Sequence, residues 1–189
     1  MPYEDFWFHD GPWTEQDYLA LPPGGPKIEL LDGRLIVSPA ARTAHQRLMR
    51  RLANLLEHGA PEEPAVEIEL NVRVGPHKIF IPDVVATYKG GGEVLVQDPR
   101  DVLLIVEVLS PSNCGEEWIE KNRLYAKAGL EWYLLVELDE AGEDPTLILW
   151  RLDTMRHYRE VGRAGCGGTL ELPEPLGSID PADLLKRHP

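Results

Sequence analysis

Apolar and polar residues alternate in distinct patterns along the chain, and each pattern predicts a type of secondary structure. Two short apolar runs, Ile28–Leu31 and Arg34–Val37, flank the pair Asp32-Gly33. An Asp-Gly pair favours a two-residue turn because both turn positions need a positive φ. The pattern therefore predicts a β-hairpin over residues 28–37.

Two further segments have the capping residues and the periodicity of helices. Thr14 is placed to cap a short helix that ends by Leu21, before a pair of prolines. Thr43 and Gln46 have the spacing of a capping box, which predicts a helix from Thr43 to about Glu57. Its apolar residues repeat at the spacing of a buried helical face: Leu48, Leu52, Leu55 and Leu56.

Two more helices are expected later in the chain. Residues 116–128 form the first, which should end at Gly129 because glycine readily adopts the left-handed conformation that follows a helix. The second is a short terminal helix that begins at Pro181 and has Asp180 as its N-cap.

Residues 66–74 alternate without exception, with an apolar residue at every even position, and so predict a strand buried on one face. Lys78–Tyr88 is expected to be its partner strand. Pro82 interrupts this partner. Because proline cannot donate a ladder hydrogen bond, that position belongs at a sheet edge or a bulge.

Val102–Leu109 is apolar on both faces apart from Glu107, which is typical of a central strand in a covered sheet. Residues 134–138, 146–152 and 157–161 are further strand candidates, the last two as a meander. Together with the helices, these strands predict an α/β fold with a mixed β-sheet flanked by helices. We expect residues 1–189 to form a single domain, with the N-terminal helix and hairpin packed on its core.

The charge of the chain argues against binding to nucleic acid by bulk attraction. Nineteen Lys and Arg against 32 Asp and Glu give a net charge of −13. Any contact with DNA must therefore be local. The strongly basic stretch between Arg34 and Arg51 contains the best candidates for phosphate contacts, although a solvated helix flank is the more common role for such residues: Arg42, Arg47, Arg50 and Arg51.

The remaining composition indicates a cytoplasmic protein that makes no membrane contact. Two cysteines, Cys114 and Cys166, are too few for a disulfide framework and lack metal-ligand spacing. The N-terminus is acidic and has no apolar stretch behind it, unlike a secretory signal. No apolar run approaches the roughly 18 residues that a membrane helix requires.

Two acidic residues stand where acids are costly. Asp83 lies between Ile81 and Val84, and Glu107 lies inside an apolar strand. A buried carboxylate costs several kcal/mol unless a cation or strong donors compensate its charge. Two acids at the ends of neighbouring strands could hold Mg²⁺. The alternative is that each acid faces solvent or accepts hydrogen bonds from backbone amides.

The residues around these acids resemble a known family. Ile81-Pro82-Asp83-Val84-Val85 and Val106-Glu107-Val108-Leu109-Ser110-Pro111-Ser112 resemble the metal-site pattern of the PD-(D/E)XK nuclease superfamily, and specifically the Uma (Uma-two) family of putative restriction endonucleases. The order and spacing of further matching segments make the resemblance specific: Thr14-x-x-Asp17-Tyr18-Leu19, Ile28-Glu29-Leu30-Leu31-Asp32-Gly33, Ser38-Pro39, His45-Gln46, Lys121, Tyr125 and Ala128-Gly129.

The resemblance implies a restriction-endonuclease-like core and a set of site residues. Asp83 and Glu107 would bind Mg²⁺, or alternatively Mn²⁺, with the Val108 carbonyl as a further ligand and Glu29 nearby. The superfamily pattern expects a lysine two residues after Glu107, where this chain has Leu109.

In members of this type a lysine on the following helix takes its place, and this corresponds to Lys121. Such a lysine could orient the attacking water or neutralise the scissile phosphate. Lys121 could instead form an ordinary helix-surface pair with Glu117, four residues earlier.

His45 is a further candidate, for phosphate contact or proton transfer, although a histidine at this position is more often a packing or capping group. Two functions stay open at this point. The first is a Mg²⁺-dependent endonuclease acting on DNA, which would need two subunits, for example a homodimer, for concerted double-strand cutting. The second is a catalytically silent module that keeps the nuclease fold and acts through partners. The intact pair Asp83 and Glu107 favours the enzyme, and the net charge of −13 favours the module.

Overall fold

The computed structural model describes residues 9–39, 41–59, 64–88, 94–109, 116–139 and 144–186. Its helices are α1 (Glu15–Leu19), α2 (Thr43–Gly59) and α3 (Glu116–Ala128), with short 3₁₀ turns η2 (Pro99–Asp101) and η3 (Pro181–Leu184). The strands in the first half are β1 (Ile28–Leu31), β2 (Arg34–Val37), β3 (Ala65–Ile68), β4 (Val72–Gly75), β5 (Lys78–Phe80) and β6 (Val84–Thr87). Those in the second half are β7 (Val102–Leu109), β8 (Trp132–Leu138), β9 (Pro145–Leu152), β10 (Tyr158–Ala164), β11 (Leu170–Glu171) and β12 (Ser178–Ile179).

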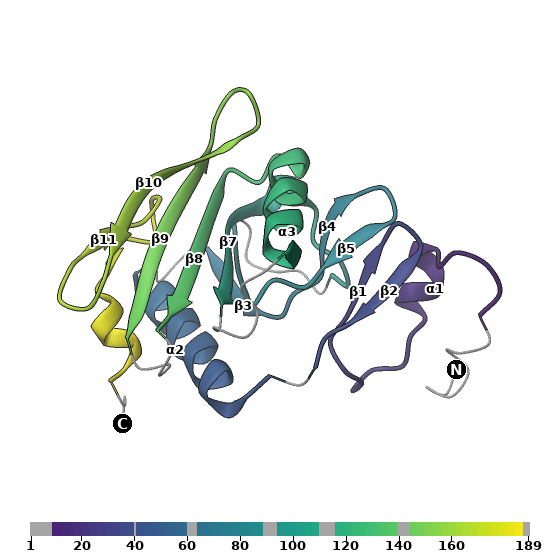
Figure 1. Ribbon diagram of the computed structural model, residues 1–189, viewed down its shortest axis with the longest axis horizontal. Coiled ribbons are helices and arrows are strands. Elements are labelled where there is room, and N and C mark those ends of the chain that lie inside the picture. The colour runs from purple at the N-terminus through teal and green to yellow at the C-terminus, as the bar shows by residue number, and fades with distance from the viewer. Residues whose placement is uncertain are drawn as a thin grey trace.

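The centre of the molecule is a mixed six-stranded sheet in the order β10-β9-β8-β7-β6-β3 (Figure 1). Strands β7 and β8 are parallel and are joined through α3, whereas the other neighbours in this sheet are antiparallel. This arrangement confirms the predicted α/β fold with a mixed sheet between helices. It also confirms the predicted meander, which begins one strand earlier, at β8.

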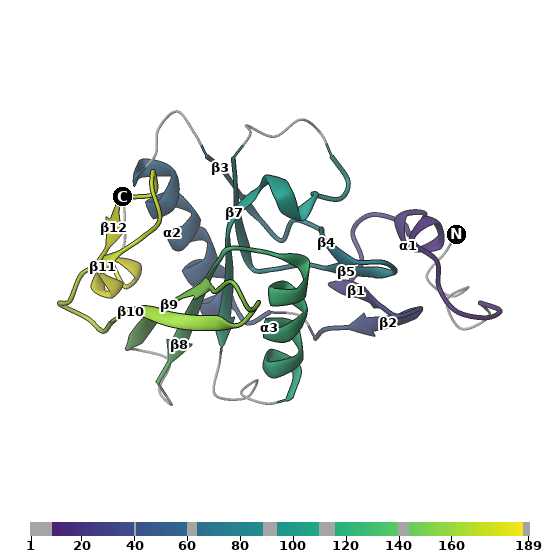
Figure 2. The same ribbon diagram turned by 90° about the horizontal axis from the view of Figure 1, so that it is seen from above.

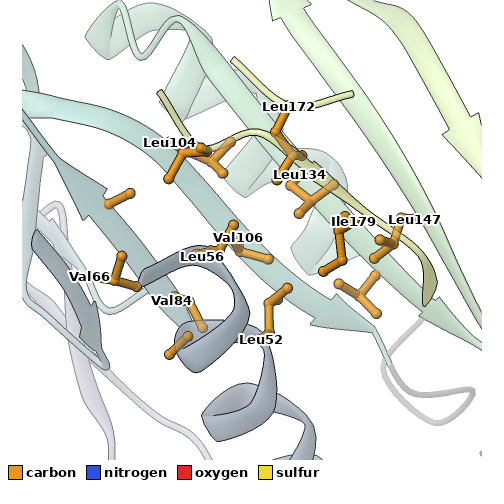
Figure 3. Packing of buried hydrophobic residues seen from close by; sticks show 14 of the residues in the cluster. Leu52, Leu56, Val66, Val84, Leu104, Val106, Leu134, Leu147, Leu172 and Ile179 are labelled. Carbon is orange, nitrogen blue, oxygen red and sulfur yellow. The ribbon is translucent and has the colours of Figure 1, made fainter. Parts of the chain in front are cut away.

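Helices α2 and α3 cover opposite faces of this sheet, as the view from above shows (Figure 2). On the α2 face, Leu52 and Leu56 pack against Val84 and Val106 (Figure 3). On the α3 face, Tyr125 packs in a second buried cluster. From Leu104 onward, residues of β7 alternate between the two clusters because side chains alternate across a strand. The odd-numbered Glu107 therefore shares the α3 face with Ile105.

A second sheet of four strands, in the order β2-β1-β5-β4, carries the N-terminal part of the chain. The predicted hairpin is confirmed: β1 and β2 pair around Asp32 and Gly33, whose φ angles are 50° and 78°. Strand β1 also pairs with β5, and Phe80 of β5 belongs to the cluster under α3. This contact sets β1 beside the end of the central sheet.

The structure corrects two strand predictions. The expected single strand over residues 66–74 is divided into β3 and β4, which lie in different sheets, and its partner is divided into β5 and β6. The chain turns at Glu69, whose φ is 55° and whose amide donates to the Asp83 carbonyl. The interruption in the partner is at Pro82, as expected from its missing donor. An uninterrupted apolar alternation thus spans two strands that bury their side chains in different clusters.

Most helix ends agree with the sequence, with one correction. Thr14 forms the expected capping box with Asp17, and Gly129 follows α3 with a φ of 85°. Thr43 is the first residue of α2 and not its cap, because the Gln46 amide already bonds to the Arg42 carbonyl. The terminal helix is a 3₁₀ turn, with the predicted N-cap Asp180. Among the described residues, no helix is long and apolar enough to cross a membrane.

The packing of α2 predicts a large effect of a core truncation. Leu52 is fully buried against the central sheet, so Leu52→Ala should lower the free energy of unfolding by about 2–5 kcal/mol through lost burial and the cavity left behind. Urea denaturation measures this change. Ile119 on α3 is exposed, and Ile119→Ala should change the free energy by less than about 0.5 kcal/mol. Equal effects at the two positions would contradict the packing described here.

Candidate active site

Three carboxylates are buried together at one end of the central sheet. Glu29, Asp83 and Glu107 are the only charged residues that are buried in the part of the chain the structure describes. Glu29 comes from β1, Asp83 precedes β6 and Glu107 belongs to β7. Val84 pairs with Val106, so continuing this antiparallel register by one residue sets Asp83 beside Glu107. The pairing of β6 with β7 thus brings together two acids that are 24 positions apart in the sequence.

Asp83 is held by donors from three directions. Lys27 Nζ lies 3.0 Å from Oδ1, the Val108 amide donates to Oδ2 at 2.8 Å, and His45 Nε2 lies 3.3 Å from Oδ2. Burial by itself would raise the pKa of the Asp83 carboxyl, but these hydrogen bonds and the Lys27 charge together hold that pKa well below its usual range. Asp83 is therefore an anion in the folded protein.

Lys121 of α3 connects the other two acids. Its ammonium group lies 2.9 Å from Glu29 Oε1 and 3.4 Å from Glu107 Oε1. Glu29 Oε1 also accepts from the Ile81 amide at 2.8 Å, and Glu107 Oε1 accepts from the Tyr125 hydroxyl at 2.6 Å. These contacts hold one oxygen of each glutamate in place.

Aromatic side chains form the apolar wall behind Glu107. The ring centroids of Tyr125 and Phe80 are 5.8 Å apart, and those of Tyr125 and Tyr133 are also 5.8 Å apart. Trp118 donates to the Tyr133 hydroxyl at 2.9 Å. Burial in this wall is the largest cause of the raised pKa of the Glu107 carboxyl; Lys121 partly opposes it, and Asp83 adds to it.

The structure places the residues singled out by the sequence in one cluster. Glu29, Glu107 and Lys121 are in direct contact through the lysine, and His45 contacts Asp83. Their catalytic and metal-binding roles stay predictions. Val108 contacts the site through its amide, and its predicted role as a carbonyl ligand stays a prediction too. The alternative partner of Lys121, the Glu117 side chain, and the matched segment 110–112 lie outside the described residues.

Sequence reasoning missed Lys27. Its side chain is only 17% exposed and it pairs with Asp83. Burial would lower the pKa of the Lys27 ammonium, but Asp83 and Glu107 raise it above its ordinary value. A signal for it was present, because Lys27 is the single cation among seven carboxylates in residues 1–32 and stands two residues before Glu29. Residues at i and i+2 of a strand share a face.

The donor set suits a hard divalent cation, although the present arrangement is not a metal cage. Carboxylate oxygens are the ligands that Mg²⁺ prefers, and Glu29 Oε2 is buried without a hydrogen-bond partner. Within the described residues, no group of three or more His, Cys, Asp or Glu side chains is spaced to hold a metal ion. The ammonium groups of Lys27 and Lys121 lie among the acids instead. A cation would therefore share or take over contacts that the lysines now make.

The four arginines proposed for DNA contact do not all have free side chains. Arg47 and Arg50 are exposed on α2, the helix that also carries His45, and Arg42 is exposed directly before that helix. Arg51 is half-buried and donates to the Leu184 carbonyl at 2.7 Å, so it ties α2 to the C-terminal turn η3. A structural role accounts for this arginine.

Comparison with known proteins identifies the family of the chain. The model of the Uma2 family, described as "Putative restriction endonuclease", matches residues 15–182, a range that contains every site residue named above. The chain belongs to the Uma2 family. This membership confirms the resemblance seen in the sequence and supports a nuclease.

The fold of this Uma2 member is shared with a solved structure. The crystal structure of a putative nuclease from Anabaena variabilis is similar with a TM-score of 0.66 and 19% sequence identity, over 92% of this chain and 97% of that one. At this identity the similarity concerns the fold. A search of curated proteins gave no match.

The raised pKa of Glu107 predicts a pH dependence of stability. Between its ordinary value of 4.5 and its higher value in the fold, the folded protein binds a proton that the unfolded chain has lost. The free energy of unfolding should therefore fall as pH rises through this window, and Glu107→Gln should remove that fall. Urea denaturation at several values from about pH 5 to pH 7 measures both slopes.

Titration of Asp83 does not contribute to the slope in this pH range. Its pKa is depressed, so its contribution is complete above the ordinary value of 3.8 and is lost only in stronger acid. Glu57→Gln, on the exposed side of α2, is the matched control and should leave the wild-type slope in place. A Glu107→Gln protein with the wild-type slope would show that Glu107 is not the group that titrates.

Proposed function

We propose that the protein is an endonuclease that hydrolyses DNA phosphodiester bonds with the help of a divalent cation, Mg²⁺ or Mn²⁺. The observation that carries this proposal is the cluster of three buried carboxylates and two lysines at one end of the central sheet. Retaining three acids in an apolar setting costs stability, which favours a role beyond folding. Membership of the Uma2 family supports the same class of reaction.

Asp83, Glu107 and Glu29 would supply the oxygen ligands of the cation. When bound, such an ion polarises the phosphoryl oxygens and makes its bound water a better nucleophile. The Val108 amide and the Tyr125 hydroxyl keep the carboxylates of Asp83 and Glu107 in fixed positions. Because these donors are part of a strand and a packed helix, little reorganisation is needed when substrate arrives.

Lys121 takes the role of the lysine that is missing at position 109. Its ammonium group lies among the acids, where it can orient the attacking water or offset the charge on the scissile phosphate. The ring of Phe80 lies 5.5 Å from Nζ and keeps this side chain in place. His45 lies at the N-terminal end of α2, with its Nε2 atom 3.3 Å from Asp83 Oδ2. At this position it can contact a phosphate or transfer a proton.

The exposed arginines at the start of α2 indicate where DNA would bind. Arg47 and Arg50 lie on the same helix as His45, and Arg42 directly precedes it, so a phosphate backbone along α2 would pass the carboxylates. The net charge of −13 opposes binding elsewhere on the surface. We therefore propose weak, strongly salt-dependent DNA binding at this helix.

A second candidate is a module that keeps the fold without cleavage. The observations that favour it are the net charge and the position of both lysines among the acids, where a cation would otherwise lie. Such a protein would bind partners through the same face but would show no divalent-dependent hydrolysis. A cleavage assay distinguishes the two functions.

We predict a large loss of DNA cleavage in one variant. With Mg²⁺ or Mn²⁺ and low ionic strength, wild-type protein should nick supercoiled DNA, and Glu107→Gln should reduce the rate by at least about a hundredfold, because it removes a ligand of an ion that contributes several kcal/mol to the transition state. Lys121→Ala should also reduce turnover. Glu160→Gln, at an exposed position on β10, is the matched control and should cleave like wild type.

In the contrary result, neither the wild type nor Glu107→Gln cleaves any of the three substrates, supercoiled, duplex and single-stranded DNA. That result would favour the module. Salt must be kept low in these assays because exposed phosphate contacts weaken steeply as ionic strength rises.

Cation binding should also stabilise the folded protein. Mg²⁺ binds only the folded site, so it should raise the melting temperature of the wild type, and Asp83→Asn should abolish this rise. Thermal unfolding with and without Mg²⁺ measures the effect. Asp98→Asn is a control at a partly exposed aspartate that pairs with Arg100 outside the acid cluster, and it should keep the wild-type response. An equal response in wild type and Asp83→Asn would place the ion elsewhere.

A further inference from the structure

Lys27 occupies a distinct position in the proposed metal site. It precedes β1, and its backbone carbonyl is fixed by the Ser38 amide, whereas its ammonium group extends 3.0 Å from Asp83 Oδ1. Lys121 contacts the other two acids, Glu29 and Glu107. Lys27 thus forms an ion pair with Asp83, and Lys121 forms ion pairs with the two glutamates.

Both carboxylate oxygens of Asp83, one of the proposed metal ligands, have polar partners. The Val108 amide at 2.8 Å and His45 at 3.3 Å share Oδ2, and Lys27 holds Oδ1. The amide cannot leave without breaking the backbone arrangement of β7, to which Val108 belongs. Lys27 is a long side chain with several rotatable bonds, so it is the partner that can withdraw at the lowest cost.

Charge leads to the same conclusion. With all three carboxylates ionised, they and the two ammonium groups leave the cluster with one excess negative charge, not counting His45. A divalent cation reverses this to one excess positive charge and repels the ammonium beside Asp83. A phosphodiester carries one negative charge and restores the balance. The cluster therefore suits one divalent cation together with one phosphate.

We infer that a divalent cation displaces Lys27 from Asp83, and that the displaced ammonium group then binds the phosphate of the substrate. The inference rests on the proposed function, since it concerns the same site. It makes Lys27 a competitor of the cation in the free protein and a partner of the nucleic acid in the loaded one. Cation binding and phosphate binding are coupled through this one side chain.

The first test measures cation affinity without DNA, by titration with Mn²⁺ alone. Lys27→Met removes the competing charge, so Mn²⁺ should bind about threefold to tenfold more tightly than to wild type. Lys27→Gln removes the charge but keeps a donor for Asp83, and it should also bind more tightly if the methionine variant folds poorly. Lys78→Met is the matched control, because Lys78 pairs with Asp32 and its side chain is 19% exposed, and its Mn²⁺ affinity should be unchanged.

The second test measures binding of duplex DNA with Ca²⁺ as the cation, at low salt. Lys27→Met and Lys27→Gln should bind DNA at least about threefold more weakly than wild type, and Lys27→Arg should restore binding because it restores the charge. The inference thus predicts that the neutral Lys27 variants bind the cation more tightly and DNA more weakly than wild type. A lysine that only stabilises the fold would move neither affinity in this way.

Other results would overturn the inference. Unchanged or weaker Mn²⁺ binding by both neutral variants excludes displacement, and unchanged DNA binding excludes the phosphate contact. Asp83→Asn separates this failure from failure of the proposed function. If Asp83→Asn binds Mn²⁺ like wild type, the proposed metal site itself is wrong. If it loses Mn²⁺ binding while the Lys27 variants do not gain affinity, only the inference about Lys27 is wrong.

Discussion

Burying three carboxylates at one end of a sheet is the constraint on which the rest of this structure depends. An ionised acid in an apolar interior must be paired with a cation or with strong donors. The protein meets this requirement with Lys27 beside Asp83, with Lys121 between Glu29 and Glu107, and with hydrogen bonds from the backbone and Tyr125. These compensating groups come from separate parts of the chain: Lys27 precedes β1, Val108 belongs to β7, and Lys121 and Tyr125 belong to α3.

The two sheets and two helices are what bring these groups together. The hairpin sheet brings Lys27 and Glu29, and the central sheet carries Glu107. The helices approach from opposite faces: α2 contributes His45, and α3 contributes Lys121 and Tyr125. The apolar clusters under the helices fix their positions. Core packing and site geometry are therefore linked, because a shift of either helix moves a polar side chain relative to the acids.

The secondary structure could be predicted largely from local patterns. The Asp32-Gly33 turn, the helices and the apolar strand Val102–Leu109 have signals that depend on neighbouring residues only. The division of residues 66–74 into two strands could not be predicted this way. A period of two records only that alternate side chains are buried, and it is the same whether they enter one cluster or two.

For the site, the hydrophobic pattern already indicated that Asp83 and Glu107 are acids in apolar surroundings, and the family resemblance added Glu29, His45 and Lys121. Which charges are in contact follows from the fold alone. The Lys27 contact spans 56 positions and the Lys121 contact with Glu29 spans 92. Such contacts depend on strand pairing and helix packing across the whole fold. A lone lysine in an acidic segment therefore has no local signal for the carboxylate it neutralises.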